Sequence, residues 1–269
     1  MTEQFSPSAT PQVSWLLCSH VVDDQLRLAL QSCLSQTFKD FELIVVANGA
    51  AAADVAAAVR EWVGGDPRVR VFTTEIRHLI FSLSLGLHHA RGILVARMDG
   101  DDISKVNRLE RQVAYMNAHP EVAVLGTAYE IIDADGSTQG LVTLPVSDTA
   151  IRKAMLKGNP LCHPSVMFRR KAVLDVGGYL GALHAEDYDL WLRMAANPGN
   201  KFANLEEACL SYRSVGVGAA RRSRSAYATM AAAQYRNFLN GQGWVWVVAV
   251  LMTTVKAFVR SNAGRPGSY

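Results

Sequence analysis

Short continuous apolar runs alternate with helically spaced apolar stripes over the first hundred residues. Four runs have the length of buried strands, and three segments between them repeat apolar residues at the spacing of a helix face. Strands without polar alternation are typical of a parallel sheet with helices on both faces. The pattern predicts an α/β domain with strands at 13–18, 41–47, 69–73 and 93–98 and helices at 23–35, 54–63 and 79–91.

The second half of the chain has a less regular pattern. Ser104 is a suitable N-cap for a helix that ends near His119, where Pro120 would stop it. The segment from Asp133 to Gly136 indicates a hairpin between two strand-like runs. Further extended segments are predicted at 122–127, 164–168 and 208–212, and further helices at 148–157 and 187–196.

From about residue 214 the chain changes character. A glycine- and arginine-containing segment precedes a helix-like run at 226–239 and a strongly apolar run from Trp244 to Val255. The apolar run is shorter than the roughly 20 residues that a membrane-spanning helix needs. Tryptophan at one end and basic residues at the other suit a helix in a membrane interface, and a core helix that closes the domain is the alternative. We therefore expect a polar arm (1–12), one domain (13–213) and a basic, apolar helical tail (214–269).

Charge is distributed unevenly along the chain. Residues 1–207 carry 19 Lys and Arg against 24 Asp and Glu, whereas 208–269 carry eight basic residues and no acidic one. The net charge of +3 therefore hides an acidic body and a basic tail. Near an anionic leaflet each basic charge contributes about 1 kcal/mol. Because arginine and aromatic residues do not interleave into a stacking platform, we expect no nucleic acid partner.

Cysteine use and the first residues bear on location. The four cysteines are widely spaced and form no Cys-x-x-Cys pair, which is typical of a reducing compartment. The polar first 12 residues lack the apolar core of a secretory signal. We therefore expect a cytoplasmic protein that contacts the inner face of a membrane through its tail.

The tetrad Asp99-Gly100-Asp101-Asp102 directly follows the fourth apolar run. Open α/β sheets bind ligands at the C-terminal ends of their strands. Carboxylates this dense repel one another unless a cation neutralises them, and oxygen ligands suit Mg²⁺ or Mn²⁺ shared with substrate phosphates. The tetrad indicates a nucleotide diphosphate site, and a solvated acidic turn is the alternative.

A second acidic pair, Glu186-Asp187, comes at the start of the amphipathic helix predicted at 187–196. A carboxylate at this position can act as a general base. Acidic residues also stabilise helix N-termini without any catalytic role, so capping is the alternative.

Taken in order with other motifs, the two acidic motifs resemble the inverting family-2 glycosyltransferases of the GT-A fold. The further matches are Ser32 to Phe38, Phe41 to Val46, Arg108 to Gln112, Asn159 to Arg170, Gly177 to Tyr179 and Tyr212-Arg213. The resemblance covers 13–213 and implies a Rossmann-like mixed sheet flanked by helices. It also implies metal-dependent transfer of a sugar from a nucleotide-diphosphate-sugar to a hydroxyl of a glycan or lipid-linked acceptor, in cell-surface polysaccharide synthesis.

The resemblance implies roles for the acidic residues. Asp99 would contact the nucleotide, and Asp101 with Asp102 would hold the Mg²⁺ or Mn²⁺ ion that bridges the phosphates. Asp187 would deprotonate the acceptor hydroxyl, and Glu186 is the rival base because adjacent acids are not separated by sequence.

Other residues are assigned by the same resemblance. His163 and Gly178 would lie on the acceptor side, although a hydrogen-bonded loop histidine is an equal alternative for His163. Arg213 would reach the diphosphate, with a structural salt bridge as its alternative. Ser19 and Asn48 are expected on the nucleotide side.

The chain departs from the family pattern on its nucleotide half. Residues 18–21 replace Pro-x-Tyr-Asn, 47–50 replace Asp-Asp-Gly-Ser, and 77–81 lack the usual Asn and Gly. A UDP-sugar is the default expectation, with GDP- and dTDP-sugars open.

Two other functions compete with sugar transfer. A degenerate member that binds a nucleotide-sugar or a partner without turnover is the alternative, and the missing carboxylate at Ala47 favours it. A nucleotidyltransferase would need a glycine-rich phosphate loop after the first strand, which 19–22 does not provide.

Overall fold

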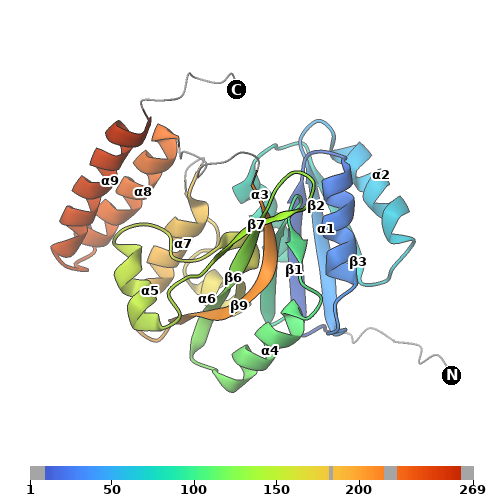
Figure 1. Cartoon of the computed structure of the whole chain (residues 1–269), viewed down its shortest axis with the longest axis horizontal. Coiled ribbons are helices and arrows are strands. Elements are labelled where there is room, and N and C mark those ends of the chain that lie inside the picture. The colour runs from blue at the N-terminus through green and yellow to red at the C-terminus, as the bar shows by residue number, and fades with distance from the viewer. Residues whose placement is uncertain (1–9, 182–183, 215–222, 262–269) are drawn as a thin grey trace.

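The structure, a computed structural model, describes residues 10–181, 184–214 and 223–261, with side chains up to residue 259. Within these residues the chain forms one mixed sheet with the strand order β3-β2-β1-β4-β8-β6-β9-β5, and β7 pairs with β6. Helices cover both faces of the sheet, and a pair of C-terminal helices stands at one end of the molecule (Figure 1).

The first half of the sheet is parallel, as the apolar pattern predicts. Its strands are β1 (Val13–Ser19), β2 (Phe41–Asn48), β3 (Val69–Thr74) and β4 (Leu94–Asp99), and its helices are α1 (Asp24–Leu34), α2 (Ala52–Val63) and α3 (Leu79–His89). Local signals set the helix ends. The Asp23 carboxylate accepts a hydrogen bond from the Leu26 amide at 2.8 Å and begins α1, and Gly64 at a φ of 58° ends α2.

The second half adds antiparallel pairing. Its elements are β5 (Ile103–Ser104), α4 (Arg108–Ala118), β6 (Val122–Ile132), β7 (Thr138–Val142), α5 (Asp148–Met155), a 3-10 turn (His163–Ser165), β8 (Met167–Arg169), α6 (Arg170–Asp175), α7 (Glu186–Ala195) and β9 (Lys201–Arg213). β8 runs antiparallel between β4 and β6, whereas β9 runs parallel to β6. β8 thus joins the two halves beside the strand that carries the acidic tetrad.

Three local predictions for this half are corrected. Ser104 is not an N-cap, because it lies in β5 opposite Leu210 of β9, and Asn107 precedes α4. The extended segment at 164–168 begins as a 3-10 turn, and its strand starts at Met167. β6 and β9 are longer than predicted, because they pair with each other through register shifts. The predicted hairpin is confirmed between β6 and β7.

Two apolar cores lie on opposite faces of the sheet, because successive strand residues point to opposite sides. On one face Trp15 and Leu17 of β1 pack with residues of α1, α2 and α4. On the other face Leu16 of β1 packs with residues of α3, α7 and α8. The second core includes Trp191 of α7 and so fixes the helix that begins with the acidic pair.

The tail forms two helices, α8 (Arg224–Leu239) and α9 (Val245–Ser261). α8 belongs to the body, since Met230 is buried in the second core and the Gln234 amide donates to the Tyr188 hydroxyl at 2.9 Å. α9 packs beside α8, away from the sheet (Figure 1). Of the helices in the described ranges, none is both long and apolar enough to cross a membrane.

A buried carboxylate ties three elements together at the N-terminal end of the parallel strands. Glu42 of β2 is 1% exposed and accepts hydrogen bonds from the Ser14 hydroxyl at 2.7 Å and from the Arg91 amide at 2.8 Å. It also pairs with the Arg70 guanidinium at 2.7 Å. These donors hold the pKa of Glu42 below its usual value although burial acts in the opposite direction.

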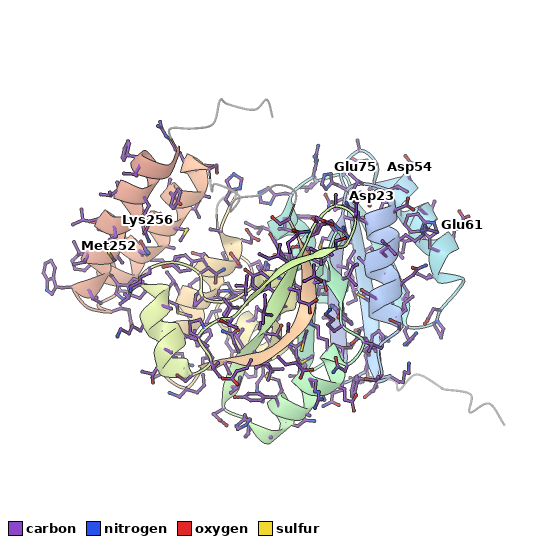
Figure 2. All side chains as sticks on the ribbon, in the orientation of Figure 1. Asp23, Asp54, Glu61, Glu75, Met252 and Lys256 are labelled. Atoms are coloured by element: carbon purple, nitrogen blue, oxygen red, sulfur yellow. The ribbon has the colours of Figure 1, made fainter. Side chains whose placement is uncertain are left out.

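We predict that Glu42→Gln lowers the free energy of unfolding by about 2 kcal/mol at pH 7, because charge-assisted hydrogen bonds are lost. A lowered folded-state pKa stabilises the fold above the unfolded value of about 4.3. The difference between wild type and variant should therefore shrink as the pH falls below that value. Urea denaturation at several pH values measures it. Glu61→Gln is the control, because Glu61 projects outward from α2 (Figure 2), and an equal effect of both variants would contradict the prediction.

Candidate active site

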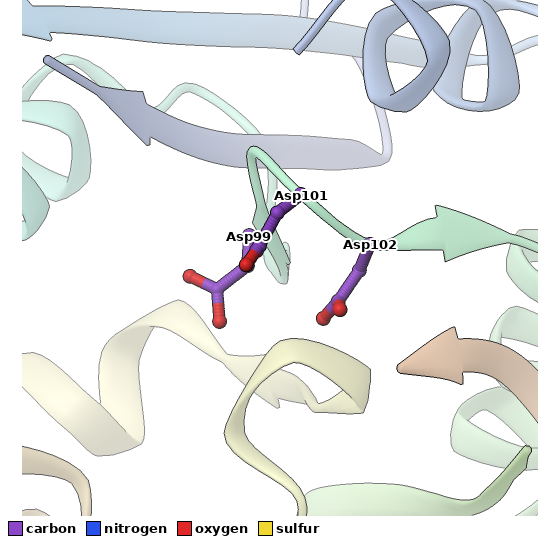
Figure 3. Close-up of side chains that lie close together, drawn as sticks. All are labelled: Asp99, Asp101 and Asp102. Atoms are coloured by element: carbon purple, nitrogen blue, oxygen red, sulfur yellow. The ribbon is translucent and has the colours of Figure 1, made fainter. Parts of the chain in front are cut away.

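The three aspartates of the tetrad converge at the end of β4. One carboxylate oxygen from each of Asp99, Asp101 and Asp102 lies within 4.8 Å of the others. Figure 3 shows the three side chains on the same side of the turn. Three carboxylates at this separation fit a hard divalent cation, which prefers oxygen ligands.

Asp102 is the most buried member of this cluster. Its side chain is 1% exposed; one oxygen accepts a hydrogen bond from the Arg213 amide at 2.8 Å, and the other has no partner among the described residues. Burial and the charge of Asp99 raise the pKa of Asp102 to about 8, and the same two causes raise the pKa of Asp101. A buried carboxylate oxygen without a donor fits a cation ligand.

Arg213 links the backbone of the tetrad to a neighbouring hairpin. Its guanidinium donates to the backbone carbonyls of Asp101 at 2.8 Å, Asp133 at 2.7 Å and Ala134 at 2.6 Å, and its side chain is buried. In the described structure Arg213 thus bonds to carbonyl oxygens and joins the tetrad to the β6–β7 hairpin. The contact with a diphosphate that sequence suggests stays a prediction.

Arg97 is a site residue that sequence reasoning missed. It lies two positions before Asp99 on β4, hence on the same face of the sheet, and forms an ion pair with Asp99. Its side chain is 3% exposed, and two of its nitrogens have no partner among the described residues. The signal was an arginine inside an otherwise apolar strand, because a buried charge needs a compensating partner.

Two cavities meet at the tetrad, with Asp99 and Leu79 in the walls of both. The smaller has a volume of about 450 Å³, and the larger about 1130 Å³. The smaller is lined by Ser19 and Asn48, which were predicted on the nucleotide side, and by Asp101, a predicted cation ligand. It is also lined by four residues for which no role was predicted, namely His20, Asp23, Arg77 and His78. The larger is lined by the acidic pair and its surroundings, including Arg97, Tyr129, Asn159, His163, Glu186, Asp187 and Tyr212.

The wall of the smaller cavity includes two buried polar side chains. Asn48, 5% exposed at the end of β2, and Ser19, 6% exposed at the end of β1, are buried there. The Ser19 hydroxyl donates to the Val21 carbonyl at 3.0 Å. The side chain of Arg77 lies over Gly49, where a Cβ atom would be 3.1 Å from the Arg77 Cβ. This contact brings an arginine to the turn at 47–50, where the family pattern has two aspartates and this chain has Ala47 and Asn48.

The acidic pair begins α7 through a strained backbone residue. Ala185 has a φ of 57°, the only positive value of a non-glycine residue among those described. Burial and the charge of Asp187 raise the pKa of Glu186 to about 7. The Asp187 carboxylate accepts hydrogen bonds from the Asn159 side-chain amide and, at 2.7 Å, from the Tyr188 backbone amide. Both carboxylates line the larger cavity.

His163 lies against this pair. Its Nδ1 is 3.6 Å from a Glu186 oxygen, and its Nε2 is 2.9 Å from the Tyr179 hydroxyl. Burial lowers the pKa of His163, so the imidazole is neutral at pH 7. Gly178, at a φ of 70°, accepts a hydrogen bond from Arg193 through its carbonyl and, within the described part of the chain, lines neither cavity.

Solved structures share this arrangement of the chain. S. aureus TarS in complex with UDP-GlcNAc matches with a TM-score of 0.66 at 17% identity, over 93% of this chain and 72% of the TarS chain. The mannosyltransferase PcManGT from Pyrobaculum calidifontis, in complex with GDP-Man and Mn²⁺, matches with a TM-score of 0.59 at 16% identity, over 98% and 79%. At these identities the likeness establishes the fold, and the predicted GT-A fold is confirmed.

Sequence relatives define the class of enzyme. The Escherichia coli O-antigen biosynthesis glycosyltransferase WbnJ is 32% identical over 249 residues, 92% of this chain and 97% of WbnJ. An E. coli UDP-Gal:alpha-D-GlcNAc-diphosphoundecaprenol beta-1,3-galactosyltransferase is 30% identical over 222 residues, 81% of this chain and 80% of that enzyme. The chain is a glycosyltransferase. The model of Glycosyl transferase family 2 matches residues 14–177, and the chain belongs to this family, as its motifs predicted.

We predict that Asp187→Asn lowers the pKa of Glu186 from its value of about 7, because the neighbouring negative charge is removed while burial stays. Carboxyl ¹³C NMR of protein labelled on glutamate measures this pKa, and Glu186→Gln assigns the signal. Asp175→Asn, on the exposed end of α6, is the control. An unchanged Glu186 titration in Asp187→Asn would show that the two carboxylates are not coupled.

Proposed function

We propose that this glycosyltransferase transfers a sugar, with inversion and with a bound Mg²⁺ or Mn²⁺, from a nucleotide-diphosphate-sugar to an acceptor hydroxyl. The observation that carries the proposal is the carboxylate cluster at the junction of two cavities, with a buried Asp102 oxygen that lacks a donor among the described residues. The missing carboxylate at Ala47 favours the non-catalytic alternative, whereas the presence of both acidic motifs in the cavity walls supports turnover.

The site supports a division of roles. Asp101 and Asp102 would hold the cation, which as a Lewis acid neutralises charge on the leaving diphosphate. Asp187 takes the proton of the acceptor hydroxyl, whose oxygen attacks the anomeric carbon as the bond to the diphosphate breaks. Asn159 holds the Asp187 carboxylate in the cavity wall. Glu186, with a pKa of about 7 and His163 beside it, is the rival base.

Asn48 favours a nucleotide with uracil or thymine as its base in the smaller cavity. Its buried amide offers one acceptor and two donors. Uracil places an N–H between two carbonyls, so one amide can pair with both kinds of group. The Watson–Crick edge of guanine places two donors side by side, which suits a carboxylate better. The solved structures that share the fold hold UDP-GlcNAc or GDP-Man and so support a nucleotide-sugar donor of either base.

The acceptor is proposed to be a glycan or a lipid-linked glycan of a cell-surface polysaccharide. The names of the two E. coli relatives support this class, since they refer to O-antigen biosynthesis and to a diphosphoundecaprenol-linked sugar. The larger cavity has the room for such an acceptor beside the acidic pair.

The tail supports peripheral contact with the cytoplasmic face of a membrane. α9 packs on α8 with one face and exposes apolar residues on the other, including Val248 at 54%, Leu251 at 61% and Val255 at 59%. Residues 208–269 carry eight basic residues and no acidic one. An exposed apolar helix face in a basic segment fits an anionic lipid surface.

We predict metal-dependent nucleotide release from one donor in a panel of UDP-, dTDP- and GDP-sugars offered with a glycolipid extract. Asp101→Ala and Asp187→Asn should each lower the rate at least about 100-fold, because the first loses a cation ligand and the second the base. Coupled nucleotide detection with Mn²⁺, Mg²⁺ or EDTA measures the rate. Asp54→Ala, on the surface of α2, is the control. Metal-dependent nucleotide binding without release from any donor would support the non-catalytic alternative.

We predict binding of the full chain to vesicles that contain phosphatidylglycerol, weakened by salt because surface charges are screened. Serine at Val248, Leu251 and Val255 together should weaken binding more than tenfold, since each truncation costs about 1 kcal/mol of apolar transfer. Vesicle flotation measures the bound fraction. Serine at Ile93, Val106 and Leu141, exposed at 64%, 53% and 61% on the body, is the matched control. Equal losses in both triple variants would rule out docking through α9.

A further inference from the structure

An aromatic pair in the larger cavity has no role in the functions assigned above. Tyr129 of β6 and Tyr212 of β9 come from adjacent parallel strands, with Tyr212 opposite Ile131. Their ring centroids are 5.6 Å apart at an interplanar angle of 61°. Both rings line the cavity, and Tyr212 is 36% exposed.

Polar groups adjoin this pair on the same wall. Asp133 and Gln139 of the β6–β7 hairpin also line the cavity, and the Gln139 amide donates to the Asp133 carboxylate at 2.7 Å. The wall therefore offers aromatic surface next to hydrogen-bonding groups. A pyranose ring has the matching chemistry, because its C–H face is apolar and its hydroxyls point outward from the ring.

The place of the pair separates it from the nucleotide-side cavity. Asp99 and Leu79 are common to both cavities, whereas both tyrosines and the hairpin residues line the larger cavity and not the smaller, nucleotide-side cavity. The acidic pair Glu186-Asp187 lines the larger cavity as well. A ring held by Tyr129 and Tyr212 thus lies in the cavity of the base and outside the nucleotide cavity, as an acceptor must.

We propose that Tyr129 and Tyr212 form an acceptor subsite that stacks on the C–H face of a pyranose, with Asp133 and Gln139 binding its hydroxyls. The proposal rests on the proposed sugar transfer for the identity of the reaction. The binding of a sugar ring can be tested without turnover. The phenol of Tyr212 stays neutral at working pH, because burial and Asp102 raise its pKa to about 12.

Phenylalanine and leucine substitutions separate stacking from plain apolar contact. In the full chain, Tyr212→Leu and Tyr129→Leu should each raise the acceptor KM about tenfold, since an aromatic contact is worth up to about 1.5 kcal/mol beyond its area. Tyr212→Phe and Tyr129→Phe should stay within about threefold of wild type. Tyr235→Leu, 50% exposed on α8, is the control.

Binding without turnover is measured by saturation-transfer NMR with UDP and the diamagnetic ion Mg²⁺ present. The probes are octyl β-galactopyranoside, octyl N-acetyl-β-glucosaminide and the sugar-free octyl ethylene glycol ether. We expect transfer to the ring protons of at least one pyranoside in wild type, lost in both leucine variants and kept in the phenylalanine variants. The proposal is overturned if wild type binds no pyranoside ring, if leucine and phenylalanine variants bind equally, or if the sugar-free probe alone is affected. Absent nucleotide release with intact ring binding would instead contradict the proposed transfer.

Discussion

Mutual repulsion among three carboxylates at the end of β4 is the constraint on which this active site depends. The protein offsets part of this repulsion through two arginines. Arg97 pairs with Asp99, and Arg213 holds the turn through backbone hydrogen bonds. One Asp102 oxygen still lacks a donor among the described residues. A bound divalent cation would lower this remaining electrostatic cost, because its charge is opposite to that of the carboxylates.

The mixed sheet places this cluster between two chemically different cavities. On one side the parallel strands β1 and β2 end in Ser19 and Asn48, which line the smaller cavity. On the other side β6 and β9 bring Tyr129 and Tyr212 to the larger cavity. β8 joins the halves by pairing with both β4 and β6. The walls of the two cavities therefore come from different strands, and Asp99 lies where the cavities meet.

The C-terminal helix α8 also contributes to the larger cavity. α8 packs on α7, where Gln234 bonds to Tyr188 and Arg236 pairs with Asp189 at 2.6 Å. The two contacted residues of α7, Tyr188 and Asp189, directly follow the acidic pair Glu186-Asp187. α8 also contributes Ala226 and Met230 to the wall of the larger cavity. The tail thus forms part of the wall of the larger cavity and also carries the exposed apolar face of α9.

Local chemistry along the chain was sufficient for the parallel half of the fold, for the two acidic motifs and for the family, because apolar runs, the Asp23 cap and adjacent carboxylates act over short sequence distances. Contacts between distant segments were decided only by the tertiary structure. Ser104 joins β5 because β9, about a hundred residues later, pairs with it. Arg97 and Arg213 compensate the tetrad, and Tyr129 meets Tyr212, because strand order and register bring them together. Sequence periodicity specifies which face a residue occupies, whereas partners across the sheet depend on the packing of the whole chain.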